Sequence, residues 1–240
     1  MKLIPFITAG YPTLDAFWTN LRELDDNGAD VIEIGVPFTD PVADGPVIEA
    51  ASQQALANGV TLDWILDGLR QRKGQFTTKL VLMGYLNPFL QYGFQRLAAV
   101  AAEVGVYGFI IPDLPLDEDA EYRDALREKG LHLIPLVAPN TPLERMRQYA
   151  AVASGYVYVV SVLGTTGERQ GLPAGVQKTL QRARQAFDLP LALGFGFSDP
   201  SQLDAIPVAD RPDAIIFGSA LIRHLGDGGS AGEFMRRWSR

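Results

Sequence analysis

The stretch Val31-Ile-Glu-Ile-Gly-Val-Pro-Phe-Thr-Asp-Pro-Val-Ala-Asp-Gly-Pro46 joins a short apolar run to a loop and then to the start of a helix. Glu33 lies within the apolar run, which breaks at Gly35 into a loop that carries Asp40 and Asp44. Burying a carboxylate costs several kcal/mol unless it is paired, hydrogen-bonded or protonated. The position of Glu33 therefore needs an explanation.

Two interpretations of Glu33 are open from this stretch. In the plain one the strand alternates, and the acid faces solvent. In the other the strand belongs to a parallel sheet that is covered by helices, so that both of its faces are buried. An acid in such a strand fits best at a site near the carboxyl end of the strand, and we favour this functional interpretation.

Outward from this stretch, the chain repeats an apolar run followed by a helical pattern about every thirty residues. The expected strands are 2–8, 29–35, 80–83, 107–111, 132–137, 156–161, 189–194 and 213–217. The expected helices are 13–27, 46–59, 61–73, 87–105, 117–129, 142–152, 173–187 and 200–206, with a last helix at the carboxyl end.

Eight such units over 1–240 predict a single (β/α)8 TIM barrel with its active site at the C-terminal ends of the strands. The rival is an open, doubly wound sheet. No Gly-x-Gly-x-x-Gly sequence opens the first helix, and no shift in composition divides the chain, so closure is favoured.

Composition excludes several classes of function. The formal net charge of −7 argues against a nucleic-acid surface. The absence of cysteine excludes disulfides, thiolate metal sites and a cysteine nucleophile. His132 and His224 show no metal-ligand spacing, so no metal site is expected. The start of the chain lacks the pattern of a signal peptide, and no apolar run reaches the ~18 residues of a membrane span, so we expect a cytoplasmic protein without a membrane segment.

Polar residues at the expected strand ends are the candidates for chemistry. The loops after strands seven and eight are the usual phosphate site of this fold, and here they are rich in glycine, which lets the backbone approach an anion closely. The polar loop 164–167 has the character of a lid over a substrate. Plain turns are the alternative for each glycine. The strand-end candidates are Glu33, Asp44, Asp113, Thr166 and Ser219, and the phosphate loops are 194–198 and 217–220.

Aromatic and apolar residues gather near the same expected rim, and most such residues belong to a core. An apolar pocket with a phosphate site at one end and carboxylates at the other suits a flat substrate with a phosphorylated tail. These residues are Phe6, Met83, Tyr85, Tyr158 and Phe195.

The segment 33–46 resembles the signature of the tryptophan synthase alpha subunit family around its two catalytic acids. Six further blocks match the family in order, so the resemblance covers nearly the whole chain: 5–10, 83–85, 112–115, 164–167, 194–196 and 218–219. The resemblance implies retro-aldol cleavage of indole-3-glycerol phosphate to indole and glyceraldehyde 3-phosphate, without a metal or a Schiff base.

The resemblance also implies roles for individual residues. Glu33 would act as acid and base, and Asp44 would accept a hydrogen bond from the indole N–H group. Asp40 is left as a turn residue or a partner contact. Substrate contacts would come from Phe6, Tyr85, Tyr158 and Phe195, lid closure from Thr166, and phosphate binding from Gly167, Gly196, Gly218 and Ser219.

The family implies a partner, a beta subunit that carries pyridoxal phosphate, in a heterotetramer of two alpha and two beta chains. No cofactor is expected on this chain. Two departures from the family are a first strand that begins almost at Met1, without most of the usual preceding helix, and Thr165 in place of a common Val. The alternatives are a weakly active subunit that mainly activates the beta subunit, and a phosphate-binding barrel such as an isomerase of an anthranilate-linked sugar phosphate.

Overall fold

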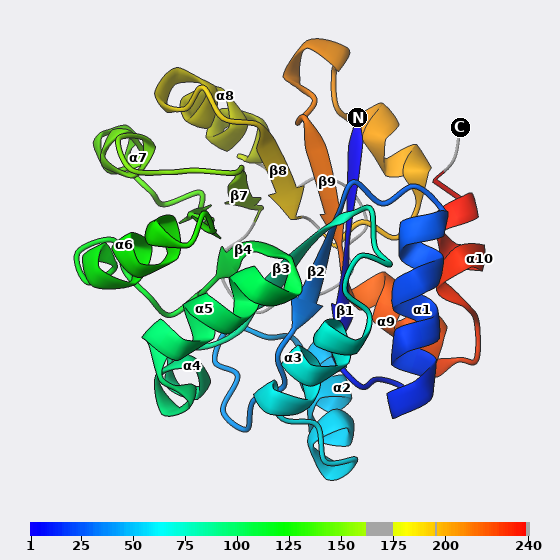
Figure 1. The fold of residues 1–240 in the computed structure, drawn as a ribbon. Coiled ribbons are helices and arrows are strands. Elements are labelled where there is room, and N and C mark those ends of the chain that lie inside the picture. The colour runs from blue at the N-terminus through cyan, green and yellow to red at the C-terminus, as the bar shows by residue number, and fades with distance from the viewer. Residues whose placement is uncertain (162–174, 195, 239–240) are drawn as a thin grey trace.

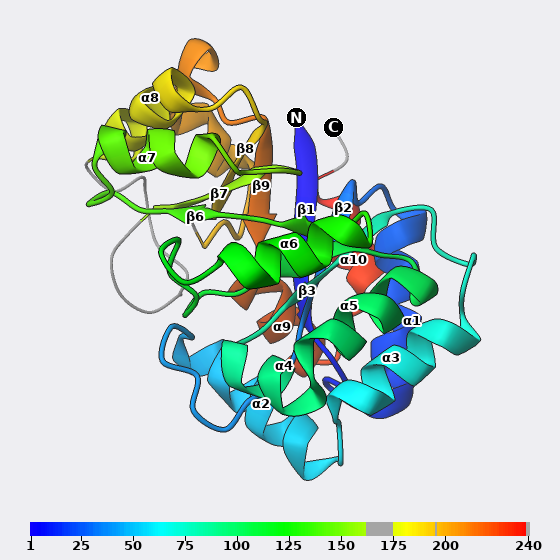
Figure 2. The same cartoon turned by 60° about the vertical axis from the view of Figure 1, so that its left-hand side comes forward.

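A computed structural model describes residues 1–161, 175–194 and 196–238 and shows one parallel sheet surrounded by helices (Figures 1 and 2). The strands are β1 Lys2–Thr8, β2 Val31–Gly35, β3 Lys79–Met83, β4 Val106–Ile110, β5 His132–Leu133, β6 Leu136–Val137, β7 Val157–Val160, β8 Leu191–Gly194 and β9 Ala214–Phe217. The α-helices are α1 Leu14–Asp26, α2 Pro46–Ala57, α3 Leu62–Gln71, α4 Leu86–Tyr92, α5 Phe94–Val104, α6 Ala120–Glu128, α7 Leu143–Ala150, α8 Val176–Ala186, α9 Ser219–Gly226 and α10 Ala231–Arg236. The short 3₁₀ helices Pro200–Ala205 and Val208–Asp210 lie between β8 and β9.

The sheet closes into a barrel through a split fifth strand. Its order runs from β5 through β4, β3, β2, β1, β9, β8 and β7 to β6, and only Ile134 and Pro135 separate the two end strands along the chain. The Ile134 amide donates to Phe109 at 2.9 Å, and the Pro135 carbonyl accepts from the Tyr158 amide at 2.9 Å. Pro135 has no N–H group, so one hydrogen bond between strands is missing at this residue. The ring of strands stays closed, because the neighbouring hydrogen bonds are made. The predicted eight-stranded barrel is confirmed, with the strand 132–137 divided into β5 and β6.

Local sequence explains how the helices begin and where one predicted helix divides. Thr13 caps α1 by accepting from the Ala16 amide, and Thr61 caps α3 by accepting from the Trp64 amide. The expected helix 87–105 is two helices, because Gly93 adopts φ 89°, a left-handed backbone that ends α4 and begins α5.

Two apolar layers hold the barrel. The inner cluster draws on residues from strands all round the ring, among them Ile4, Val81, Ile110 and Ile216. The outer cluster packs the helices against the outside of the sheet. All five residues of β2 are buried, so the solvent-facing interpretation of Glu33 is wrong. No helix in the described part of the chain is both long and apolar enough to span a bilayer.

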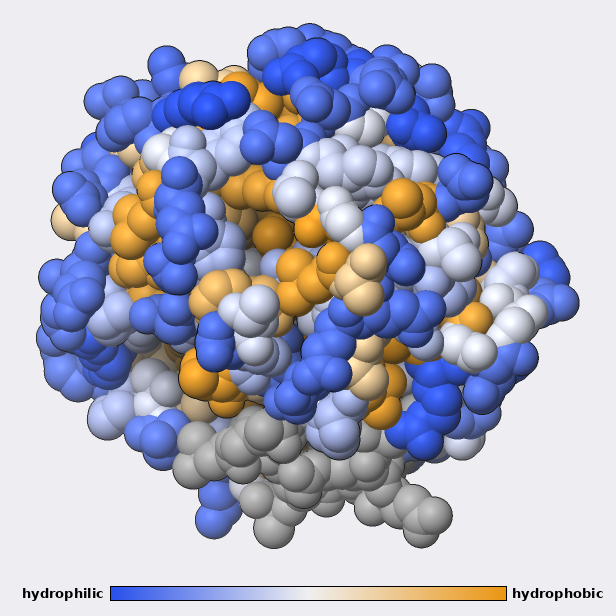
Figure 3. Space-filling model, turned by 90° about the horizontal axis from the view of Figure 1, so that it is seen from below, coloured by the Kyte–Doolittle hydropathy of each residue, from blue (hydrophilic) through white to orange (hydrophobic). Residues whose placement is uncertain are grey.

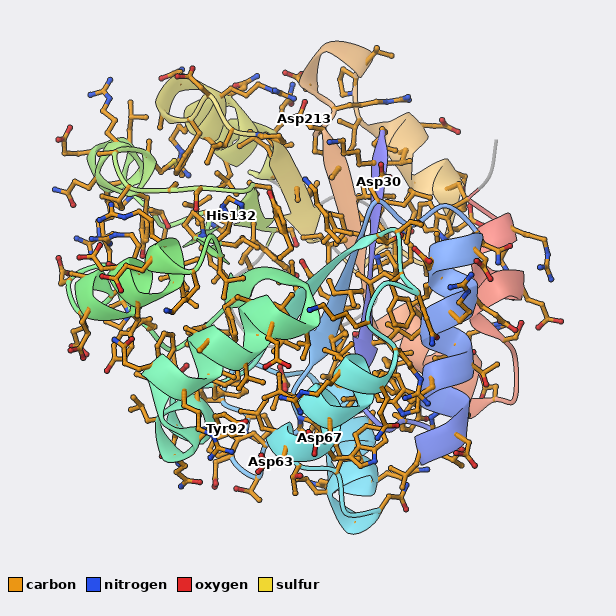
Figure 4. The ribbon with its side chains drawn as sticks, in the orientation of Figure 1. Asp30, Asp63, Asp67, Tyr92, His132 and Asp213 are labelled. Carbon is orange, nitrogen blue, oxygen red and sulfur yellow. The ribbon has the colours of Figure 1, made fainter. Side chains whose placement is uncertain are left out.

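Two aspartates link neighbouring strands by hydrogen bonds at the end of the sheet where the strands begin. Asp30, just before β2, accepts from the Leu3 amide of β1 at 2.9 Å, and Asp213, just before β9, accepts from the Leu191 amide of β8 at 2.8 Å. Figure 4 shows both aspartates at the end of the sheet where the chain begins. Neither aspartate lies at the opposite end of the sheet, where the strands stop.

Asp25 at the end of α1 is a third aspartate that joins two segments by hydrogen bonds. We predict that it contributes strongly to stability. Its carboxylate accepts from the Thr77 and Thr78 amides and from the Thr77 hydroxyl at 2.8–3.2 Å. Burial alone would raise its pKa, but these hydrogen bonds outweigh burial and lower the pKa below 3.8. Asp25→Ala should lower the free energy of unfolding by about 3 kcal/mol in urea titrations at pH 7.

The Asp25 contribution should also depend on pH. Because the folded pKa is lowered, the stabilisation is present above the unfolded pKa near 3.8 and is lost as pH falls through the folded pKa. Asp26→Ala is the matched control, since the neighbouring Asp26 is exposed on the same helix. Equal losses in the two variants would contradict this account of Asp25.

Candidate active site

Glu33 lies inside the barrel, on the central residue of β2. In the sheet register it lies between Phe6 of β1 and Val81 of β3, and its side chain is wholly buried. The Tyr156 hydroxyl donates a 2.7 Å hydrogen bond to Glu33 Oε1. Glu33 Oε2 is also buried and has no hydrogen-bond partner among the residues that the structure describes. The two oxygens therefore differ in their surroundings.

Burial makes Glu33 a weak acid. Removing the carboxylate from water raises its pKa from 4.5 to about 8, and the hydrogen bond from Tyr156 offsets only part of that rise. At neutral pH the group is therefore protonated. A general acid must hold its proton at the working pH, and Glu33 does so at pH 7.

Glycines make room for two aromatic rings beside Glu33. A Cβ atom on Gly35 would lie 2.3 Å from Phe6 Cζ, and one on Gly218 would lie 3.1 Å from Phe6 Cδ1. A Cβ atom on Gly194 would lie 2.5 Å from the Tyr158 hydroxyl oxygen. Any side chain at Gly35 or Gly194 would displace these rings. Burial and the nearby Glu33 raise the pKa of Tyr158, so its hydroxyl stays protonated.

Asp44 is held in its loop by Tyr85. The Tyr85 hydroxyl accepts from the Ala43 amide at 2.9 Å and hydrogen-bonds to the Asp44 carboxylate. Burial raises the pKa of Asp44 to about 6; the Tyr85 hydrogen bond lowers it in part, and Glu49 raises it further. Asp44 also raises the pKa of Tyr158, which places the loop acid within electrostatic reach of the aromatic wall. At pH 7 Asp44 is mainly ionised.

The face at which the strands end is hollowed. Figure 1 shows β1 running downward from the amino terminus, and Figure 3 views the molecule from below, onto this face. A depression there has hydrophobic residues in its depth and hydrophilic ones around it. Such a shape suits a largely apolar ligand with a polar end.

The anion site expected from the sequence includes the amino end of α9. Gly218 is the N-cap residue and Ser219 is the first helical residue, and no side chain caps this helix end. The first-turn amides of a helix have no acceptor within the helix and attract anions. Asp199, in contrast, caps Pro200–Ala205 with its own side chain. Gly196 follows β8 with φ 70°.

Three of the candidate positions fall outside the described residues: Thr166, Gly167 and Phe195. Among the described candidates, Asp113 accepts from the Leu86 amide at 2.9 Å, which holds the start of α4. Asp40 accepts from the Thr39 hydroxyl at 2.6 Å. No group of three His, Asp or Glu side chains within 1–161, 175–194 and 196–238 is arranged to hold a metal ion.

Two buried side chains that carry a hydroxyl group, Tyr156 and Thr8, were not among the residues predicted from the sequence. Tyr156 precedes Tyr158 by two positions, so the two tyrosines share one face of a strand, and this spacing was the available signal. Thr8 ends β1, is 1% exposed, and its hydroxyl has no partner in the described part of the chain. No pattern in the sequence distinguishes this threonine from an ordinary strand end.

The fold and the site together define a (β/α)8-barrel enzyme whose acid lies within the closed ring of strands. A family model described as the tryptophan synthase alpha chain matches residues 1–236. The chain belongs to the tryptophan synthase alpha chain family.

Individual relatives agree with this assignment. The chain is 63% identical to a tryptophan synthase alpha chain of Nitratidesulfovibrio vulgaris over 99% of this chain and 91% of the relative, and 60% identical to one of Desulfovibrio desulfuricans over 98% and 92%. Among solved structures, a tryptophan synthase complex from Pyrococcus furiosus matches with a TM-score of 0.87 and 33% identity over 98% of this chain and 94% of that chain. The alpha subunit from Legionella pneumophila matches with a TM-score of 0.85 and 36% identity over 98% and 88%.

Proposed function

We propose that this chain cleaves indole-3-glycerol phosphate to indole and glyceraldehyde 3-phosphate, a step of tryptophan biosynthesis. One observation carries the proposal: two carboxyl groups are removed from water in this site, which raises the pKa of the wholly buried Glu33 to about 8 and that of Asp44 to about 6. At pH 7 Glu33 is thus an acid that can give a proton, and Asp44 is an anion that can accept a hydrogen bond. Carboxyl groups whose environments separate their pKa values in this way divide the work of acid and anion between them.

Glu33 would carry the proton in both halves of the reaction. Its carboxyl proton goes to C3 of the indole ring, which makes the ring a good leaving group. The resulting carboxylate then accepts the proton of the hydroxyl on the adjacent glycerol carbon. As that O–H bond breaks, the aldehyde forms, the carbon–carbon bond breaks, and its electron pair returns to the ring to give indole. Glu33 ends protonated, so no net proton is consumed.

Asp44 would stabilise the charge that develops during the first of these steps. Protonation at C3 leaves positive charge on the indole nitrogen, and a carboxylate that accepts its N–H hydrogen bond lowers the energy of that state. Tyr85 holds the Asp44 side chain and the Ala43 amide, so the loop is oriented before the substrate arrives. Oriented charge of this kind needs no reorganisation during the reaction.

The remaining assignments keep the roles that the resemblance to the family implies. Phe6 and Tyr158 would enclose the indole ring, as their contacts with Gly35 and Gly194 support. Ser219 and the amino end of α9 would bind the phosphate group. The proposal keeps the other expected residues in their roles: Tyr85 and Phe195 at the substrate, Gly167, Gly196 and Gly218 at the phosphate, and Thr166 in the lid.

We propose a beta subunit as the partner, in an assembly of two alpha and two beta chains. The similar tryptophan synthase complex from Pyrococcus furiosus supports pairing of this kind. Pyridoxal phosphate would be bound by the beta subunit, and no cofactor is proposed on this chain. The cytoplasm stays the predicted location.

Product analysis tests the function. The purified chain is incubated with indole-3-glycerol phosphate, with and without a beta subunit, and indole and glyceraldehyde 3-phosphate are measured together. Equal amounts of both products are expected. Turnover as high in the isolated chain as with the beta subunit would count against the activator alternative. No turnover in either state, with conversion of an anthranilate-linked sugar phosphate instead, would replace the lyase with an isomerase.

The pH dependence should distinguish the two acids. Wild-type kcat/KM is expected to rise with pH as Asp44 ionises near pH 6 and to fall as Glu33 loses its proton near pH 8. Asp44→Asn should lower kcat by about 10²-fold and remove the acidic limb, because the charge on Asp44 is gone. Asp40→Asn is the matched control in the same loop. An acidic limb that persists in Asp44→Asn would contradict this assignment.

A further inference from the structure

Tyr156 stands out among the buried titratable groups that the proposed mechanism leaves unused. It is 5% exposed, and within the described residues its hydroxyl has one hydrogen-bond partner, Glu33 Oε1 at 2.7 Å. Burial and the neighbouring Glu33 raise the pKa of Tyr156 well above its usual value. The hydroxyl therefore keeps its proton throughout the working pH range and acts as a fixed donor.

The hydrogen bond makes the two oxygens of Glu33 unequal. A protonated carboxyl has one O–H group and one carbonyl-type oxygen that accepts hydrogen bonds. Because Oε1 already accepts from Tyr156, the carboxyl proton is on Oε2, which is buried and has no partner in the described part of the chain. The oxygen with the transferable proton is thus the one that is free to meet a substrate.

We infer that Tyr156 is a positioning residue that holds Glu33 Oε1 and thereby assigns proton transfer to Oε2. This inference rests on the proposed function for its kinetic consequences only. The hydroxyl fixes the rotation of the carboxyl group, so that the same oxygen gives the proton to the ring and takes one back from the glycerol hydroxyl. Misplacing a catalytic group by about 1 Å can cost 10²-fold in rate, so such a support has a measurable effect.

Removing the hydroxyl should change both the rate and the titration of Glu33. In Tyr156→Phe, kcat should fall about tenfold with KM changed less than about twofold, because the carboxyl loses its orientation but the pocket stays. The hydrogen bond stabilises the carboxylate, so its loss should move the basic limb of the pH profile upward by about one pH unit. A residue that only fills space would leave that limb in place.

A second variant keeps the hydroxyl and the fold. Site-specific 3-fluorotyrosine at position 156 makes the donor more acidic and its hydrogen bond to a carboxylate stronger, so the basic limb should move to lower pH. Tyr107→Phe is the matched control, because Tyr107 is another tyrosine of the barrel interior and packs against His132 rather than Glu33. Its profile should match that of the wild type.

A double-mutant cycle and a substrate-free measurement complete the test. If Tyr156 acts through Glu33, adding Tyr156→Phe to Glu33→Gln should not lower the residual rate further. The Glu33 carboxyl carbon, followed by NMR in the free chain, should titrate at higher pH in Tyr156→Phe than in the wild type. That readout needs no substrate, so failure of the proposed function leaves it intact. An unchanged Glu33 titration, or additive losses in the cycle, would overturn the inference.

Discussion

Indole release by the Glu33→Gln chain should be slower than wild type by about 10²–10⁴-fold in kcat, the usual contribution of a general acid and base. Glutamine has nearly the shape of a protonated glutamate and can accept the Tyr156 hydrogen bond, but it has no transferable carboxyl proton. The substrate should still bind, because neither the aromatic wall nor the amino end of α9 is altered. Rapid-quench single-turnover measurements at saturating substrate separate binding from chemistry.

Two controls make the Glu33→Gln result specific. Glu103→Gln changes an exposed glutamate on α5 that pairs with Arg70, and its kcat should equal that of the wild type. Substrate affinity of Glu33→Gln, measured by calorimetry, should stay within a few-fold of the wild-type value. Substantial turnover in Glu33→Gln would remove Glu33 from the proposed mechanism.

The same buried acid should make the barrel less stable as pH rises. The folded pKa of Glu33 is about 8 and its ordinary value is 4.5, so between these values the folded chain holds a proton that the unfolded chain has lost. The free energy of unfolding should therefore fall across this window, by about 5 kcal/mol in total, and should level off above pH 8. Urea titrations from pH 5 to 9 measure the effect.

Glu33→Gln isolates this contribution, since every other titrating group is common to the two proteins. The stability of the variant relative to wild type should increase steadily from pH 5 to pH 8, because glutamine has no charge to acquire. The catalytic acid thus costs stability at the pH where it works, a known compromise between stability and activity. A difference between the two proteins that does not change with pH would show that Glu33 is not held protonated by the fold.

Periodicity predicted most of the barrel, because each buried strand is a short apolar run and each helix follows with a 3.6-residue pattern. The division of the strand 132–137 could not be read from hydrophobicity, since it depends on how Pro135 meets its two neighbours in the closed sheet. The division at Gly93 was equally hidden, because a lone glycine within a helical pattern is often tolerated.

The acidic residues likewise include one that the sequence could predict and contacts that it could not. Glu33 was predictable because a carboxylate in an apolar run is anomalous in any setting. Asp113 was a candidate because it follows a strand, but its hydrogen bond from the Leu86 amide joins segments 27 residues apart and could not be read from the sequence. Tyr156 was missed for the same reason, since its partner Glu33 is 123 residues away.

We expect the fold to keep Glu33 protonated at neutral pH and so to make it a proton donor. Carbon-13 NMR of the free chain, with the glutamate side-chain carboxyl carbons labelled and the Glu33 resonance identified by its absence in Glu33→Gln, measures this state directly. We expect this resonance to titrate with a pKa of about 8. A midpoint near 4.5, the ordinary value for glutamate, would contradict it.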